Sequence, residues 1–195
     1  MYQHGENDRR MAWDWRPEIH DSDGLSMHTG AGEWIWRPLK NPTQLRYNAF
    51  SDNNPRGFGL LQRDRNFENY QDDGVYYERR PCLWVEPKAG WGAGTIDLVE
   101  IPTVDETFDN IVAYWVPRQA PGPGQPLELS YRLHWQGTQD QRPPNGWTVQ
   151  SRSGRGYAPL PADQQQVVVD FAGPALDKLP AGAPVEAVAS AEAGS

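Results

Sequence analysis

The sequence contains one cysteine, no long apolar run and no excess of basic residues, and each shortage excludes a class of protein. Because Cys82 is alone among 195 residues, the chain can form no intrachain disulfide and no cysteine-based metal site. No stretch of 18 apolar residues occurs, so no membrane-spanning segment is expected. The net charge of −8, with arginines scattered among carboxylates, argues against nucleic acid as the main partner.

The N-terminal residues are polar and contain no apolar core of a signal peptide. Taken alone, this feature indicates a cytoplasmic protein. The same residues would also be expected if the first half of a secreted protein were missing. The N-terminal sequence therefore leaves the cellular location open.

Glycine and proline, 19 and 18 residues, interrupt the chain every few positions, which is incompatible with long helices. The runs between them are rich in β-branched and aromatic residues, as strands are. The clearest run is Leu127–Trp135, where apolar and polar residues alternate. Many short strands predict an all-β fold, a sandwich or a barrel. Strands are expected at Glu33–Arg37, Val75–Glu78, Leu83–Glu86, Thr95–Ile101, Ile111–Val116, Leu127–Trp135, Trp147–Ser151 and Gln166–Phe171.

A polar segment rich in Gly, Pro and Gln follows Trp135 and is typical of a linker. We therefore expect a first domain over residues 1–136, a linker over 137–147 and the start of a second domain over 148–195. Two strand candidates after the linker are too few for a complete domain. Residues 172–195 are mostly Ala, Pro and Gly and cannot complete a core.

Two acidic clusters are candidates for chemistry: His20-Asp21-Ser22-Asp23-Gly24, and Asp105 to Asn110 between two predicted strands. Glycoside hydrolysis needs two carboxyl groups in different protonation states, and loops commonly present them. Solvated turn carboxylates are the more common explanation of such clusters. The 9 Trp, 8 Tyr and 5 Phe residues allow a carbohydrate site, although most such rings belong to the core.

Other chemistries have less support. Asp21 and Asp23 with His20 and His28 lack the EF-hand ligand series, and no HExxH motif is present, so no metal is expected. Cys82, in a strand-like run, is interpreted as a buried structural thiol. No cofactor is expected, because two glycine pairs that resemble phosphate loops lead into no helical pattern and are interpreted as turns or bulges. These pairs are Gly30-Ala-Gly32 and Gly57-Phe-Gly59.

Several long strings, in order, are similar to the signature of the osmoregulated periplasmic glucan biosynthesis proteins of the OpgG/OpgD (MdoG/MdoD) type. The similarity runs from about Gly5 to Phe171. The strings are Arg16–Leu25, Met27–Leu39, Asn54–Arg65, Tyr77–Pro81, Leu83–Pro87, Val99–Pro102 and Asp105–Thr107.

This resemblance implies a fold and a location. The family combines a large galactose-mutarotase-like β-sandwich domain with a smaller immunoglobulin-like β-sandwich. The chain would then be an internal fragment of a longer periplasmic protein that acts on β-1,2-glucan. A membrane glucan glucosyltransferase is a further candidate partner, and the oligomeric state is left open.

The resemblance also implies residue roles, those of an inverting endo-β-1,2-glucanase. Asp109 would be the general acid, and Asp21 the general base, acting through a water relay beside Glu106 and Thr107. The substrate-binding candidates are Tyr77, Arg80, Trp34, Trp36, Asp23 and His20. The alternatives are a non-catalytic factor that binds glucan during assembly, and an isolated fragment that folds poorly. Phe108 departs from the family pattern, which has a small polar residue, usually Asn, before the acid, and Cys82 replaces what is commonly Ser.

Overall fold

The computed structural model describes residues 16–138, 140–154, 160–161, 164 and 166–190. In this part of the chain, antiparallel strands form three sheets, and the helical segments are only three or four residues long. The prediction of an all-β fold is confirmed. None of the described helices is long and apolar enough to cross a membrane.

The first sheet has the order β2-β1-β4-β5-β8, the second β3-β6-β7, and the third is the pair β9-β10. The first sheet comprises β1 (Gly24–His28), β2 (Trp34–Pro38), β4 (Gly57–Leu61), β5 (Cys82–Pro87) and β8 (Tyr131–Gln136). The second and third comprise β3 (Arg46–Asn53), β6 (Ala93–Glu100), β7 (Ile111–Pro117), β9 (Trp147–Gly154) and β10 (Gln166–Ala172). The helical segments are α1 (Phe67–Tyr70), the 3-10 helix η2 (Tyr77–Arg79) and α2 (Pro174–Asp177).

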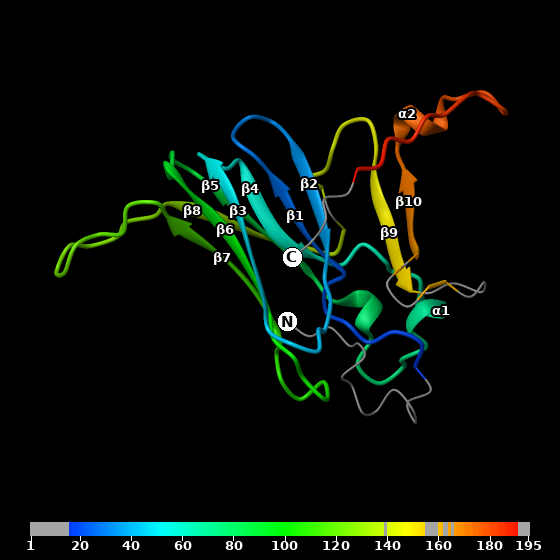
Figure 1. Cartoon of the computed structure of the whole chain (residues 1–195), viewed down its shortest axis with the longest axis horizontal. Helices are drawn as coiled ribbons and strands as arrows, with labels where there is room; N and C mark the ends of the chain where they lie inside the picture. Colours follow the sequence, from blue (N-terminus) through cyan, green and yellow to red (C-terminus); the bar gives the residue numbers. More distant parts are fainter. Residues whose placement is uncertain (1–15, 139, 155–159, 162–163, 165, 191–195) are drawn as a thin grey trace.

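The five-stranded and three-stranded sheets pack face to face as a sandwich (Figure 1). One apolar cluster joins them, because alternate residues of each strand point inward. Burial of each large side chain stabilises the fold by about 1.5–3 kcal/mol. The fully or nearly buried members are Leu25, Met27, Leu39, Phe58, Ile96, Leu98 and Ile111.

Two local predictions are wrong. Gly57-Phe-Gly59 is strand β4 and not a turn or bulge. Glycine is needed there because a Cβ on Gly59 would lie 2.1 Å from the Leu83 carbonyl oxygen of the neighbouring strand. The strand expected at Val75–Glu78 is instead a turn leading into η2, and Tyr76 adopts a φ of 54°. By contrast, Cys82 is buried as expected.

The strand expected over Leu127–Trp135 begins only at Tyr131. From there the predicted alternation holds, and Tyr131, Leu133 and Trp135 lie on the inward face of β8, opposite Pro87, Val85 and Leu83. These three side chains of β8 are nevertheless exposed. β8 is the edge strand of its sheet, and the described part of the second sheet leaves its inward face open.

Strand β8 ends at Gln136 and β9 begins at Trp147. The division into two domains with a linker over 137–147 stays a prediction. The guanidinium of Arg63, which follows β4, donates a 2.6 Å hydrogen bond to the Thr148 carbonyl. This bond ties the β9-β10 pair to the sandwich.

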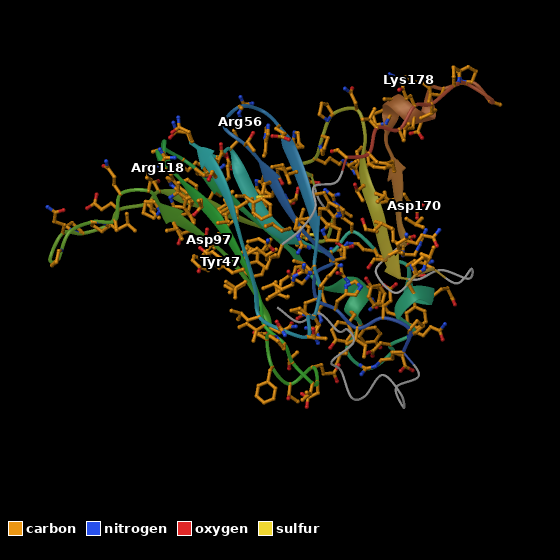
Figure 2. All side chains as sticks on the ribbon, viewed as in Figure 1. Tyr47, Arg56, Asp97, Arg118, Asp170 and Lys178 are labelled. Carbon is orange, nitrogen blue, oxygen red and sulfur yellow. The ribbon has the colours of Figure 1, made fainter. Side chains whose placement is uncertain are left out.

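The outward face of the second sheet contains a buried carboxylate. Asp97 of β6 is nearly fully buried although its side chain points away from the core. The Tyr47 hydroxyl of β3 donates a hydrogen bond to it, and Figure 2 shows the two residues side by side.

Candidate active site

Three segments from distant parts of the sequence meet at one end of the sandwich (Figure 1). They are the segment before β1, the segment with α1 and η2 before β5, and the loop between β6 and β7. Each precedes or follows a strand of the packed core, so the sandwich places polar loop residues on a rigid support.

Tyr77 and Glu106 form the centre of this site. The Tyr77 hydroxyl, on η2, donates a 2.9 Å hydrogen bond to Glu106 Oε2 of the β6–β7 loop. Burial, this hydrogen bond and the nearby charges of Glu106 and Asp21 raise the pKa of Tyr77 above its ordinary value. The phenol therefore stays protonated at neutral pH and can act as a hydrogen-bond donor.

Asp21 and Arg80 lie beside this pair. The guanidinium Nε of Arg80 is 3.5 Å from Asp21 Oδ1. The same guanidinium lies 5.1 Å from the centre of the Tyr77 ring, within the range of a cation–π contact. Arg80 is partly exposed, so it can also donate to a bound molecule. The structure thus brings together four of the predicted site residues: Asp21, Tyr77, Arg80 and Glu106.

Sequence reasoning missed Arg16 and Asp72 as members of this site. Arg16 donates to Asp72 Oδ2 at 2.7 Å and to Glu106 Oε2 at 3.2 Å. Asp72 Oδ1 accepts hydrogen bonds from the backbone N–H groups of Gly74 and Val75, which shapes the turn before η2. Burial raises the Asp72 pKa, but Arg16 and these hydrogen bonds outweigh it and hold the pKa below its usual range. In the sequence, the feature that could have indicated Arg16 as a site residue is its place at the start of the string Arg16–Leu25, which resembles the family signature.

The β6–β7 loop is held at its base and exposed at its tip. Asn41 exchanges two hydrogen bonds with the backbone of Thr103, of 2.9 and 3.0 Å. At the tip, the Thr107 backbone N–H donates to Asp105 Oδ1 at 2.9 Å. Thr107, Phe108 and Asp109 are exposed, and 62% of Phe108 is accessible to solvent.

His20 and Asp23, on either side of the Asp21 segment, belong to a buried polar network. The His20 ring nitrogens lie 3.0 Å from Gln62 Oε1 and 3.1 Å from Glu18 Oε2. Burial lowers the His20 pKa, but Glu18, Asp23 and Gln62 outweigh it and raise the pKa overall. Because both ring nitrogens face acceptor oxygens, the doubly protonated imidazolium fits this environment.

Asp23 holds the chain that follows β4. Its Oδ2 accepts from the backbone N–H groups of Arg63 and Asp64, at 2.9 and 2.8 Å. Its Oδ1 is buried without a hydrogen-bond partner in the described structure. Burial raises the Asp23 pKa to about 6, although His20 and the two backbone donors oppose the rise. The structure thus places Asp23 in a structural network next to Asp21.

Trp34 and Trp36 lie on the face of the five-stranded sheet that points away from the sandwich core. Trp34 stacks on His28 with ring centres 4.2 Å apart, and the Arg63 guanidinium covers the Trp36 ring at 3.6 Å. Trp36 lines a cavity of about 780 Å³ together with His20 and Asp23, and β9 forms another wall. The predicted binding residues therefore divide between this cavity, the Trp34 surface and the Tyr77–Glu106 site.

The fold and the site define an all-β sandwich protein whose loops gather tyrosine, arginine and carboxylate side chains at one end. The comparisons with known proteins then show the family. A family model described as "Periplasmic glucan biosynthesis protein, MdoG" matches residues 1–195, and the chain belongs to this family.

Similar curated proteins are named "Glucans biosynthesis protein D". The protein from Stenotrophomonas maltophilia strain K279a is 62% identical over 197 residues, which cover 100% of this chain and 37% of the relative. The protein from Xanthomonas campestris pv. campestris is 69% identical over 156 residues, 80% of this chain and 29% of the relative. The matched residues thus cover 37% and 29% of the length of these two relatives.

Proposed function

We propose that this chain carries the active-site segments of a periplasmic glucan biosynthesis protein that hydrolyses β-1,2-glucan backbones with inversion. Asp109 acts as the general acid, and Asp21 activates water through a relay. The observation that carries the proposal is the hydrogen bond between Tyr77 and Glu106 beside Asp21. It supplies polar groups between the segment of the base and the loop of the acid, as a relay requires.

The chemistry of an inverting hydrolase suits this arrangement. The acid protonates the leaving glycosidic oxygen while the base removes a proton from the attacking water, so the carboxyls must leave room for water, about 6.5–9.5 Å or more with a relay. The neutral Tyr77 hydroxyl orients Glu106 by donating to it. Arg80, partly exposed beside Asp21, can hold sugar hydroxyl groups in the subsites.

The test is chain shortening of linear β-1,2-glucan, followed by chromatography. It is run with this chain and with the full-length Stenotrophomonas relative, because this chain spans 37% of that protein. Asp109→Asn and Asp21→Asn, and substitution by Asn at the aligned positions of the relative, should each reduce the rate by about 10²–10⁴-fold. Rates unchanged by both substitutions would exclude the two assigned roles.

A second function, a non-catalytic factor that binds glucan and assists a membrane glucosyltransferase, is favoured by one observation. A general acid is usually set in a partly buried pocket, whereas the described loop leaves Asp109 exposed next to the exposed ring of Phe108. Well-folded protein that binds β-1,2-glucan in calorimetry without shortening it would establish this function instead.

A further inference from the structure

The motif Gln62-Arg63-Asp64-Arg65 directly follows β4 and has no role in the proposed chemistry. We propose that Gln62 and Arg65 are positioning residues that hold the segment of Tyr77 and Arg80 against the segment of Asp21. The expected effect on catalysis rests on the proposed function. The positioning role itself rests on the hydrogen bonds of the Gln62 and Arg65 side chains.

Gln62 connects the two segments through one buried amide. Its Nε2 group lies 3.2 Å from the carbonyl of His20, the neighbour of Asp21, and 3.2 Å from the carbonyl of Tyr77. Its Oε1 lies 3.0 Å from His20 Nδ1. The side chain is almost completely buried, so water cannot replace these hydrogen bonds if the amide is removed.

Arg65 holds the other end of the Tyr77–Arg80 segment. Its Nη1 donates to the Glu78 carbonyl and its Nη2 to the Arg80 carbonyl, each at 2.9 Å. The planar guanidinium thus bridges two carbonyls of the segment, which a lysine ammonium on a flexible chain reproduces poorly. Nη2 also contacts the buried Cys82 Sγ at 3.3 Å, at the start of β5.

The backbone of the motif is tied to the Asp21 segment as well. Asp23 Oδ2 accepts from the N–H groups of Arg63 and Asp64. The motif is therefore bound to the Asp21 segment through Asp23 and His20, and to the Tyr77–Arg80 segment through Gln62 and Arg65. A displacement of about 1 Å in catalytic geometry costs about 10²-fold in rate, so loss of this connection should be visible in kcat.

The chain offers a matched control for each variant. Arg65→Lys is compared with Arg63→Lys, since the Arg63 side chain bonds the Thr148 carbonyl of β9 and contacts Trp36 instead. Gln62→Leu is compared with Tyr47→Phe, since the Tyr47 hydroxyl of β3 bonds the buried Asp97 of β6 and so also serves a buried polar group, but on the second sheet. Thermal unfolding of all four variants gives the stability loss against which other effects are judged.

Two readouts test the proposal. The first is kcat and KM on linear β-1,2-glucan, for which we expect about a 100-fold loss of kcat in Arg65→Lys and Gln62→Leu and less than a threefold loss in the controls. The second is the ¹³Cζ NMR shift of Tyr77 in ¹³C-tyrosine-labelled chain, assigned with Tyr77→Phe. This shift reports the Tyr77–Glu106 hydrogen bond and requires no turnover.

The outcomes are distinguishable. A Tyr77 shift that moves in Arg65→Lys and Gln62→Leu, but not in the controls, supports positioning even if the wild type does not shorten glucan and the hydrolase proposal fails. An unchanged Tyr77 shift, or a kcat loss equal to that of the control with the same stability loss, overturns the positioning proposal. If Gln62→Leu does not fold, the Arg65→Lys comparison decides alone.

Discussion

Glu100 is the buried acid whose removal should destabilise the sandwich most clearly. At the end of β6, its side chain is inaccessible to solvent. Its Oε2 accepts from Arg37 Nη2 at 2.9 Å, and its Oε1 accepts from the Lys40 backbone N–H at 2.7 Å. In Glu100→Gln, the new amide NH₂ must face one of these two donors. The substitution therefore removes one hydrogen bond and leaves Arg37 without its charged partner.

The size of the effect follows from burial. Breaking a buried ion pair by removing one partner costs about 3–5 kcal/mol. Because 22% of the Arg37 side chain is exposed, water can solvate its charge after Glu100 is replaced. The loss of unfolding free energy should therefore lie at the lower end of this range, about 3 kcal/mol. At about 2–4 °C per kcal/mol for a chain of this size, the melting temperature should fall by about 6–12 °C. Urea and thermal unfolding, followed by tryptophan fluorescence, measure both quantities.

Glu86→Gln is the matched control. Glu86 also has two close nitrogen partners, Lys88 Nζ at 2.7 Å and His134 Nε2 at 2.6 Å, but 34% of its side chain is exposed. Exposed ion pairs contribute less than about 1 kcal/mol. Equal losses of unfolding free energy in Glu86→Gln and Glu100→Gln would refute the reasoning from burial.

Three further predictions concern pH, the glucan and self-association. Because burial raises the Asp23 pKa to about 6, the folded chain binds that proton more tightly than the unfolded chain, so stability should fall as pH rises from 4 through 6. Urea midpoints measured across this pH range should show the fall in the wild type but not in Asp23→Asn. The same pH dependence of the midpoint in both proteins would contradict the assignment. Phe108→Ala should change the unfolding free energy by less than about 0.5 kcal/mol, since the ring is exposed, yet raise KM for β-1,2-glucan about 2–10-fold; an unchanged KM would show that the ring does not contact the sugar. Leu133→Lys should reduce self-association of this chain in sedimentation velocity, because 45% of Leu133 is exposed on the inward face of edge strand β8. Identical sedimentation profiles of Leu133→Lys and the wild type would show that this face does not mediate self-association.

Parts of the fold could be predicted because they depend on neighbouring residues. Alternation of apolar and polar side chains predicted a strand over Leu127–Trp135, of which the part from Tyr131 forms β8, and a β-branched run indicated β7. The same local reasoning failed for β4, where two glycines resemble a turn. Gly59 is required by the close approach of Leu83 in the neighbouring strand, and that approach is a property of the packed sheet.

Val75–Glu78 shows the opposite error. Its residues favour a strand, but Asp72 accepts the Gly74 and Val75 N–H groups, and the chain turns into η2. Propensity was outweighed by side-chain hydrogen bonds and by the contact of Arg16 with Asp72 across 56 residues of sequence.

For the site, composition and strings of residues along the chain were sufficient to indicate an all-β protein and to select Asp21, Tyr77, Arg80 and Glu106 as candidates. These features are local, and the resemblance is carried by contiguous strings. Which candidates meet was decided by tertiary packing: Tyr77 reaches Glu106 across 29 positions of sequence, while His20 turns inward to Gln62 across 42. Neighbours in sequence, such as His20 and Asp21, then have different surroundings, because the sheet beneath them buries one side chain and leaves the other at the site.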